Sequence, residues 1–511
     1  MSSSQVAAGL DLGTNSSTLA LLNEHGIAVP MKNKESQQAT RSAVLFVPGQ
    51  PPIIGQEALN AALLYPNYLA REMKLHIGEK DSQGQDVAMI IDAEGKSYTP
   101  VEIQALVADK LIRDANAQIP QPITAIALAV PATYANKERQ SMMRIAELVG
   151  CKLLRLIEEP VAAAYTFINT CRDVVDGIFL VFDLGAGTTD LSTVELCGAN
   201  PRIQVTQGKA IGGRRFDMAL MEVVAGIAKK AGIDIEAAKD PATLHEFGEK
   251  TERAKHSLSS SEKALFYMNF EGKILRTDLL RSDFEKASQP ILAELKELIR
   301  ATLAAAKLRP QDTQGILLNG PGCEMPMIQA MLGEVLPGVA LRHDIDPVTA
   351  VAQGTALAAV QAVQQDGGEA ISRAGTKIKA LDAVATLRAV STNCLGCEYL
   401  VDRNRDTKAF AIIIPANSPL PTTKADTFSL IDERQTAVDV KVYEGQEGQT
   451  LDQCQYVSTV RLDGLPAGHL DVSRIVVQYS YNRSGVLEVV VSDTISKKSV
   501  SSNVSHNLGN I

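Results

Sequence analysis

The feature that most constrains the fold of this chain is a strand-and-turn pattern centred on Asp183. Residues 178–182 form an apolar run rich in large and β-branched side chains, which predicts a buried strand. The run ends at Asp183, and Gly185 and Gly187 then open a tight turn before a second short apolar segment. Glycines at such a turn let backbone N–H groups approach an anion closely. Because a plain hairpin has the same pattern, one copy leaves both interpretations open.

A second copy of the pattern favours the phosphate-binding interpretation. Residues 9–18 repeat the Asp-Leu-Gly unit as Asp11, Leu12 and Gly13, followed by hydroxyl-bearing residues. Two such hairpins far apart in the chain indicate a duplicated unit with two phosphate loops facing each other across a cleft. Asp11 and Asp183 are then expected near one metal-bound phosphate, where they hold the water shell of a magnesium ion. Neither loop has the Walker or dinucleotide-binding glycine spacing.

Length and charge limit the classes of function. A chain of 511 residues is expected to form two or three folding units. Its net charge of −9 argues against broad nucleic-acid binding, and the absence of Trp argues against base-stacking platforms. The sequence also predicts no signal peptide and no membrane span, so we expect a cytoplasmic protein.

The seven cysteines are expected to be reduced thiols, because they are odd in number and scattered through a long chain. Cys394 and Cys397 have metal or redox spacing, but no second pair accompanies them.

From residue 1 to about 365, strands alternate with helices, which predicts an α/β domain. A strand over 123–130 ends at Pro131, and an amphipathic helix is expected over 135–149. Glu158 and Glu159 lie where a further strand meets a helix begun by Pro160. Acids at such a junction are either helix N-terminal charges or a catalytic carboxylate, and the sequence leaves both open.

Other motifs follow in this region. Gly212 and Gly213 form a turn before a helix, which suits phosphate contact. Glu252, Lys255 and Ser259 share one face of a later helix, as either a polar ladder or a nucleoside site. Residues 316–319 form a strand that runs into Gly320 and Gly322, and residues 350–363 form a helix of small residues.

The alternation stops near residue 366, so we expect a linker over 366–388 and an all-β region over 389–511. Within it, strands are predicted over 409–414, 437–443, 475–481 and 486–491, with a hairpin turn at 482–485.

Taken together, these motifs resemble the 70-kDa heat-shock chaperone family of the bacterial DnaK type over nearly the whole chain. The resemblance implies a multidomain protein: a duplicated, two-lobed α/β ATPase domain of actin-like fold over 1–365, then a β-sandwich peptide-binding domain over 389–511. The motifs that carry it, in order, are the two hairpins, Glu159-Pro160-Val161-Ala162-Ala163-Ala164, Gly212-Gly213, Glu252-Arg253-Ala254-Lys255 and Leu258-Ser259-Ser260-Ser261.

The resemblance also implies roles for individual residues. Asp11 and Asp183 would hold the magnesium-bound phosphates, and Lys74 would stabilise charge on the transferred phosphoryl group. Glu159 and Asp190 would orient or activate the attacking water. Residues implied to bind the nucleotide are Asp11, Gly13, Thr14, Asn15, Gly185, Ala186, Gly187, Thr188, Gly212, Gly213, Glu252, Lys255, His256, Ser259, Gly320, Gly322 and Glu324, with Lys74, Glu159, Asp183, Thr188 and Asp190 catalytic. By the same likeness, Pro131 and Arg139 relay the nucleotide state, and Arg155 contacts J-domain co-chaperones.

Several positions depart from the family pattern. Ala186 stands where the family has Gly, and His256 and Glu324 stand where it has the two arginines that clamp adenine. Val348 replaces an Asp and Glu158 replaces an Asn. The family's leucine-rich linker is barely recognisable near residues 380–384.

In the β region, residues 395–400 match the first substrate loop of the family, and residues 435–438 match a strand that lines its peptide pocket. The resemblance implies that Cys397, Leu400, Ile431 and Val438 face an extended apolar peptide, although each is equally compatible with the sandwich core. No helical lid follows in this sequence, so we expect a lidless cleft that releases peptide quickly.

The first functional hypothesis is therefore an ATPase chaperone that uses ATP or ADP with Mg²⁺, and K⁺ as a further cation. Its expected partners are unfolded polypeptides, a J-domain co-chaperone and a nucleotide exchange factor, with no nucleic acid and no membrane. The alternative is a nucleotide-gated interaction module with one dedicated protein partner and little or no turnover. A sugar kinase of the same fold fits poorly, because it has no place for the β region.

Overall fold

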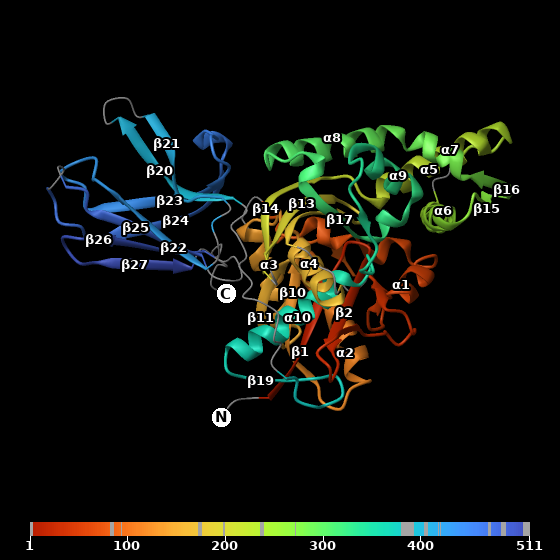
Figure 1. Cartoon of the computed structure of the whole chain (residues 1–511), viewed down its shortest axis with the longest axis horizontal. Coiled ribbons are helices and arrows are strands. Elements are labelled where there is room, and N and C mark those ends of the chain that lie inside the picture. The colour runs from red at the N-terminus through yellow and green to blue at the C-terminus, as the bar shows by residue number, and fades with distance from the viewer. Residues whose placement is uncertain are drawn as a thin grey trace. The chain divides into compact units, whose positions relative to one another are not determined.

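The computed structural model describes residues 4–81, 86–92, 95–171, 176–197, 200–235, 240–270, 272–379, 393–402, 407–416, 418, 421–468, 472–481 and 487–503. The chain divides into two compact units (Figure 1). Unit 1 comprises Met1–Glu79, Asp86–Pro131 and Arg144–Ala385, and unit 2 comprises Lys80–Gln85, Ala132–Met143 and Thr386–Ile511. Residues 380–388 of the predicted linker and the predicted turn at 482–485 lie outside the described residues. The domain boundaries at 365 and 389 stay predictions.

The first large sheet of unit 1 is built around strand β1. Its order is β11-β10-β1-β2-β3, and β19 and β4 pair with β1 and β2. Strand β1 is antiparallel to β2 and parallel to β10. The strands are β1 (Ser4–Leu12), β2 (Ser16–Leu22), β3 (Ala28–Pro30), β4 (Ala39–Arg41), β10 (Ile123–Val130), β11 (Lys152–Glu158) and β19 (Glu369–Ile371).

A five-stranded sheet in the same unit has the order β14-β13-β12-β17-β18. Strand β12 is antiparallel to β13 and parallel to β17, so it occupies the place that β1 has in the first sheet. The predicted strand at 178–182 lies within β12, and the two aspartates of the repeated pattern lie in equivalent strands. The strands are β12 (Gly177–Leu184), β13 (Thr189–Cys197), β14 (Asn200–Lys209), β17 (Thr313–Asn319) and β18 (Leu341–Arg342).

The helices begin and end largely as the sequence predicts. Thr99 and Glu102 form a reciprocal capping box at the start of α2, and Pro160 lies in the first turn of α4. The predicted helices over 135–149 and 350–363 are α3 and α10. The helices are α1 (Gln56–Ala61), α2 (Pro100–Asn116), α3 (Asn136–Leu148), α4 (Glu159–Thr170), α5 (Gly213–Lys230), α6 (Pro241–Ser260), α7 (Arg281–Ala287), α8 (Gln289–Ala305), α9 (Pro326–Val335) and α10 (Ala350–Gln365).

The described residues also form three small sheets and five short 3-10 helices. The sheets pair β5 (Ala43–Leu45) with β6 (Ile53–Ile54) and β7 (Leu69–Arg71), β8 (Ile90–Ile91) with β9 (Ser97–Tyr98), and β15 (Lys263–Phe270) with β16 (Lys273–Leu280). The 3-10 helices are η1 (Pro66–Tyr68), η2 (Met73–His76), η3 (Pro310–Asp312), η4 (Pro321–Glu324) and η5 (Leu451–Gln453).

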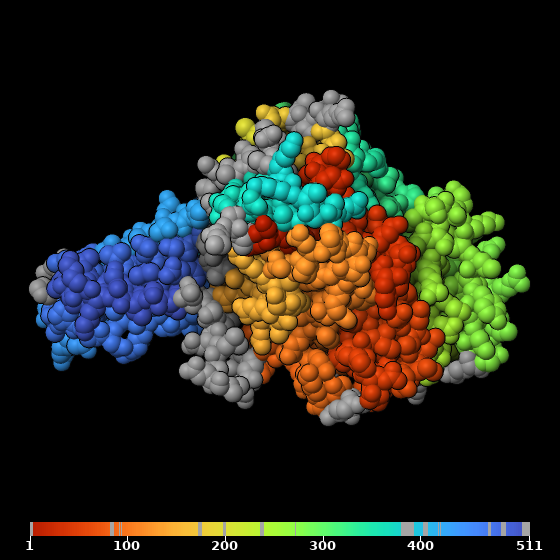
Figure 2. Space-filling model, turned by 90° about the horizontal axis from the view of Figure 1, so that it is seen from below, coloured from red at the N-terminus to blue at the C-terminus, as the bar shows by residue number. Residues whose placement is uncertain are grey.

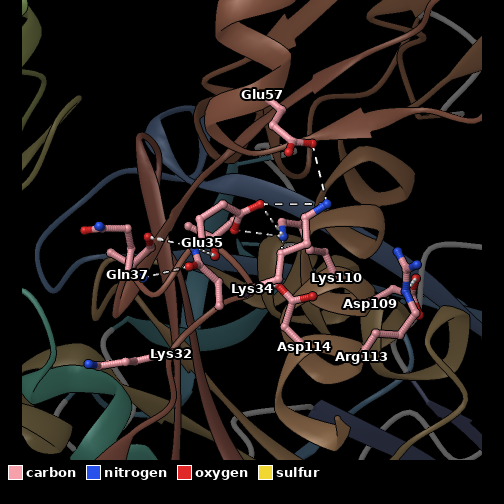
Figure 3. A network of polar contacts seen from close by, with 12 residues as sticks. Lys32, Lys34, Glu35, Gln37, Glu57, Asp109, Lys110, Arg113 and Asp114 are labelled. Atoms are coloured by element: carbon pink, nitrogen blue, oxygen red, sulfur yellow. Dashed lines mark hydrogen bonds and ion pairs between the residues drawn. The ribbon is translucent and has the colours of Figure 1, made fainter. Parts of the chain in front are cut away.

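A buried lysine ties the segment between β3 and β4 to helix α2 (Figure 3). The Lys110 side chain is 6% exposed, and its Nζ donates to Asp114 at 2.7 Å and to both Glu35 oxygens at 3.2 Å. Backbone N–H of Lys34 also donates to Asp114, at 3.2 Å. Because every charge in this group has an opposite partner, the segment can be held in place without an unpaired buried ion.

Unit 2 contains two four-stranded antiparallel sheets whose inner faces share one apolar core. One has the order β21-β20-β23-β24 and the other β22-β25-β26-β27. The predicted strands at 409–414, 437–443, 475–481 and 486–491 correspond to β21, β23, β25 and β26. Residues 395–400, matched to a substrate loop by resemblance, instead form the middle of β20. The strands are β20 (Cys394–Asp402), β21 (Thr407–Ile414), β22 (Thr422–Phe428), β23 (Ala437–Gly445), β24 (Gln455–Asp463), β25 (Ile475–Tyr481), β26 (Leu487–Asp493) and β27 (Ser499–Asn503).

All seven cysteines are free thiols. Across the described residues, no helix is both long enough and apolar enough to cross a membrane.

Candidate functional site: a carboxylate cluster between two hairpins

The candidate site in unit 1 is centred on Lys74, in the short helix η2. Its Nζ lies 2.7 Å from Glu159 Oε1 and 3.9 Å from Asp11 Oδ1, and the Lys74 and Glu159 side chains are each 10% exposed. A lysine in a short helical segment is usually solvated, but Lys74 is directed into the protein. Glu159 is the first residue of α4, so this strand-to-helix junction delivers a carboxylate to the site.

The surrounding carboxylates have more negative charge than Lys74 can balance. Burial raises the pKa of Asp11 to about 6, against the attraction of Lys74 and with the added repulsion of Glu159. Burial, Glu159 and Asp190 raise the pKa of Asp183 well above its usual range. Such a cluster favours a bound cation, which stabilises the ionised carboxylates.

The second hairpin loop packs on the start of α5. Backbone N–H of Gly213 donates to the Gly185 carbonyl at 2.9 Å, and that of Arg214 donates to the Ala186 carbonyl at 2.9 Å. A Cβ at Gly212 would lie 2.3 Å from the Ala186 oxygen, so only glycine fits there. The N–H groups of Gly213 and Arg214 thus hold the loop in place, and Gly212 gives the loop the space to approach the helix start.

Thr188 and Asp190 lie where this loop enters β13. The Thr188 hydroxyl donates to Asp190 Oδ2 at 3.2 Å, and Asp190 is 8% exposed. Asp190 is the Cα partner of Asp183 in the β12–β13 pair, so its carboxylate lies beside that of Asp183.

The α6 face that carries Glu252, Lys255 and Ser259 is a network of ion pairs. Arg41 binds Glu252 through two hydrogen bonds of 2.7 and 2.9 Å, and the Asn15 amide adds one of 2.9 Å. Burial opposes ionisation of Glu252, but the bonds from His256, Arg41 and Asn15 hold the pKa of its carboxyl well below the usual range.

Lys255 lies on the same helix and is 8% exposed. Its Nζ contacts Asp217 at 2.7 Å and the Gly213 carbonyl at 3.3 Å. The Ser259 hydroxyl donates to the Lys255 carbonyl at 3.5 Å. Glu252 and Lys255 are thus both paired within the chain, while Ser259 bonds to the helix backbone.

These contacts join N-terminal segments to α6 across unit 1. Figure 2 shows the red and orange N-terminal segments against the light-green middle of the chain, consistent with the Arg41–Glu252 pair.

The two positions matched to the adenine clamp carry different chemistry. The His256 side chain is 55% exposed and lies 3.7 Å from Glu252, and Glu324 is exposed at the end of η4. Gly320, just before η4, has a φ of 77°, and a Cβ there would lie 2.9 Å from Asp183 Oδ1. Gly320 therefore lets the backbone pass close beneath the carboxylate cluster.

Four residues of the site network carry no sequence signal that singles them out. Arg41, Asp217 and Glu249 join the α6 network, with Arg41 and Glu249 3.9 Å apart. Asn319 donates to Asp183 Oδ2 at 2.5 Å. Arg41 and Glu252 are 211 positions apart and Asn319 and Asp183 are 136 apart, so no local motif links them.

The three residues assigned to relay and co-chaperone contact are each described within their own unit. Pro131 directly follows β10 in unit 1. Arg155, also in unit 1, is 6% exposed in β11. Arg139 belongs to unit 2, is 2% exposed and donates from Nε to the Tyr134 carbonyl at 3.1 Å.

The four residues matched to the peptide pocket differ in exposure. Cys397 is 2% exposed in the sandwich core, where burial raises the pKa of its thiol to about 12. Val438 packs against the same core, Leu400 is half-buried, and Ile431 is 53% exposed. Within unit 2, Ile431 is thus the member of this set most open to a ligand.

Comparison with known proteins adds independent evidence. The family model described as Hsp70 protein matches residues 7–510. The chaperone protein DnaK of Thermus thermophilus is 30% identical over 95% of this chain and 78% of its own length. The chaperone protein dnaK1 of Synechocystis is 28% identical over 98% of this chain and 72% of its own length.

Proposed function

Because the chain belongs to the Hsp70 family, we propose that it is a molecular chaperone that binds and hydrolyses ATP to control the binding of extended apolar peptide segments. The observation that carries this proposal is the Lys74–Glu159 pair beside Asp11. A cation, a carboxylate base and further carboxylates in one buried place are the groups that phosphoryl transfer to water requires.

In the proposed reaction, a water oxygen bonds to the terminal phosphorus as the bond from that phosphorus to the bridging oxygen breaks. Glu159 orients the water and accepts its proton, with Asp190 and Thr188 supporting its position. Lys74 stabilises the negative charge on the transferred phosphoryl oxygens. The buried position of these side chains strengthens each of these electrostatic contacts.

The chemistry of the carboxylates fits a divalent cation. Among the described residues, no cluster of three or more His, Cys, Asp or Glu side chains could ligate a metal without help. Mg²⁺ usually retains several waters and binds through one or two carboxylates plus phosphate oxygens. We therefore propose that Asp11 and Asp183 hold the water shell of Mg²⁺. The ion would neutralise negative charge on the phosphates. K⁺ is proposed as a further cation near the same phosphates.

The remaining nucleotide contacts are proposed on both sides of this cluster. The hairpin loops supply backbone and hydroxyl donors to the phosphates, and the α6 face lies beside the nucleoside. The proposed residues are Gly13, Thr14, Asn15, Gly185, Ala186, Gly187, Thr188, Gly212, Gly213, Glu252, Lys255, His256, Ser259, Gly320, Gly322 and Glu324.

We propose that unit 2 binds peptide through Cys397, Leu400, Ile431 and Val438. The sandwich offers backbone hydrogen bonds and one side-chain pocket to an extended chain. J-domain co-chaperones and nucleotide exchange factors are proposed partners, with Arg155 at the co-chaperone position and Pro131 and Arg139 in the relay.

Single-turnover hydrolysis of radiolabelled ATP by the full chain tests the proposal. Lys74→Ala and Glu159→Ala are each expected to slow hydrolysis by about 100-fold or more, since each removes a group that acts in the transition state. Lys296→Ala is the matched control, because it removes a lysine ion-paired with Glu334 at 2.7 Å between α8 and α9. Equal rates in all four proteins would contradict a catalytic role for this cluster.

The second candidate function is a nucleotide-gated interaction module. It is favoured by His256 and Glu324 at the clamp positions, which weaken the expected hold on adenine. A parent protein that binds ATP without hydrolysing it, and whose unit 2 partner is not displaced by unfolded peptides, would support this alternative.

A further inference from the structure

Asn319 is the immediate neighbour of Asp183 at the ends of two parallel strands. Strands β12 and β17 are in register so that Asp183 and Asn319 are Cα partners. Partners at one register of a parallel pair project to the same face of the sheet. Asn319 Nδ2 donates to Asp183 Oδ2 at 2.5 Å, and Asn319 is 5% exposed.

This hydrogen bond shifts the pKa of Asp183 in the direction opposite to that of the neighbouring carboxylates. Glu159, Asp190 and Asp11 all raise the pKa of Asp183, whereas the bond from Asn319 lowers it. An amide carries no net charge, so it holds the carboxylate in one orientation without cancelling its negative charge. A lysine or arginine at the same place would neutralise Asp183 and compete with a metal ion.

The other end of the same amide is an unused acceptor. Asn319 Oδ1 is fully buried and has no hydrogen-bond partner in the described part of the chain. A buried acceptor without a donor is costly, and native proteins rarely keep one without a reason. Water bound to a metal ion supplies donors of the kind that this oxygen lacks.

We propose that Asn319 is a positioning residue for the hydrated metal ion: its Nδ2 fixes the Asp183 carboxylate, and its Oδ1 accepts from the metal's water shell. This inference rests on the proposed nucleotide site and adds to it a residue that acts through Asp183. It assigns Asn319 a role in metal-dependent affinity for the diphosphate, separate from contact with the nucleoside.

The test compares ADP binding by calorimetry with Mg²⁺ and with EDTA in the full-length protein and three variants. Asn319→Leu removes both polar ends at similar volume, and Asn319→Ser keeps a shorter hydroxyl group. Thr313→Val is the matched control, because Thr313 lies at the other end of β17 and its hydroxyl donates to the Pro310 carbonyl at 2.6 Å. Thermal unfolding of each variant checks that it folds.

Asn319→Leu is expected to weaken ADP binding in Mg²⁺ by about tenfold to 100-fold, the scale of a hydrogen bond to a charged group, and to leave binding in EDTA unchanged. It should also raise the Mg²⁺ concentration for half-saturation at fixed ADP. Asn319→Ser should fall between Asn319→Leu and the wild type, and Thr313→Val should match the wild type.

Unchanged Mg²⁺ dependence in Asn319→Leu, beside a Mg²⁺-dependent wild type, overturns the inference alone. If Asn319→Leu loses the same ADP affinity in Mg²⁺ and in EDTA, the inference is also overturned, because an equal loss indicates a structural role for Asn319. Wild-type protein that binds ADP without regard to Mg²⁺ overturns the proposed site together with the inference.

Discussion

At the scale of single residues, the proposed nucleotide site has closely paired side chains where we place the phosphates and exposed side chains where we place the adenine. Lys74, Glu159 and Asp183 are held by short contacts, whereas His256 is 55% exposed and Glu324 is exposed. A carboxylate near the base of a polyanionic nucleotide weakens binding, and a histidine offers less stacking area than a guanidinium. The site is therefore expected to grip phosphates more firmly than adenine.

Arginine at positions 256 and 324, which match the adenine clamp of the family, should add cation–π stacking on adenine. The double variant His256→Arg/Glu324→Arg is expected to bind ADP about tenfold more tightly, since each cation–π contact contributes about 0.5–1 kcal/mol or more. Calorimetry with ADP measures this change. Glu24→Arg, at a side chain that is 48% exposed, controls for added positive charge. An equal gain in that control would show that net charge alone, and not stacking, sets the affinity.

At the scale of elements, Gly212 at the N-terminus of helix α5 lets the helix start pack closely against the second hairpin loop. Gly212→Ala would place a methyl group 2.3 Å from the Ala186 oxygen, so the second hairpin loop or the helix must shift. We expect nucleotide binding to fall at least about tenfold and the thermal midpoint to drop.

Gly226→Ala within the same helix is the matched control for Gly212→Ala. Apart from the neighbouring residues and the backbone of the helix itself, no atom lies within 4 Å of a Cβ there, so this variant should be neutral or more stable by about 0.5–1 kcal/mol. Unimpaired ADP binding in Gly212→Ala would contradict the coupling between loop and helix.

Helix α2 carries one buried and one exposed lysine or arginine ion pair, at Lys110 and Arg113 (Figure 3). Lys110→Ala leaves Asp114 without its cation and leaves Glu35 with Lys34 alone, at 4.0 Å, and we expect a loss of about 3 kcal/mol in the free energy of unfolding. Arg113→Ala removes an ion pair with Asp109 on the exposed side of the same helix, where the side chains are 63% and 44% exposed. That loss should stay below about 0.5 kcal/mol in urea denaturation. Similar losses in both variants would contradict the distinction between buried and exposed pairs.

At the scale of the whole molecule, each unit has an apolar core of its own. We therefore expect two unfolding transitions in calorimetry. Mg²⁺-ADP should raise the unfolding temperature of unit 1, because the ligand binds the folded state alone. At an ADP concentration of 100 times the dissociation constant, the free energy of unfolding should increase by about 2.7 kcal/mol.

The unfolding temperature of unit 2 should instead fall at acidic pH. Arg474 and Asp493 form a fully buried pair with contacts of 2.6 and 2.7 Å, and the bond from Arg474 holds the pKa of Asp493 well below its usual range. Because the pKa of Asp493 is lower in the folded state than in the unfolded state, its ionised form stabilises the fold. This contribution is fully present above the unfolded-state pKa of about 4 and is lost as the pH falls below that value.

Scanning calorimetry from pH 7 down to about pH 3 measures this loss. Asp493→Asn should be less stable at neutral pH and should lose less stability than wild type on acidification. Asp439→Asn, whose partner Arg461 is 57% exposed, should keep the acid sensitivity of the wild type. An Asp493→Asn protein as acid-sensitive as the wild type would assign the effect to other carboxylates.

The sequence by itself determined the local elements and the family. The apolar run before Asp183, the strand that ends at Pro131 and the helix begun by Pro160 all have the predicted form, because periodicity and helix-start signals act within a few residues. The repeated Asp-Gly hairpins predicted two equivalent strands, and the two sheets share one strand order.

Only the tertiary structure decided which side chains meet. Lys74 reaches Glu159 across 85 positions, and Asn319 reaches Asp183 across 136. Residues 395–400, matched to a loop, form a strand because they pair with β21 and β23. These outcomes depend on which distant segments pair and pack together, and a pattern within a few residues does not encode that choice.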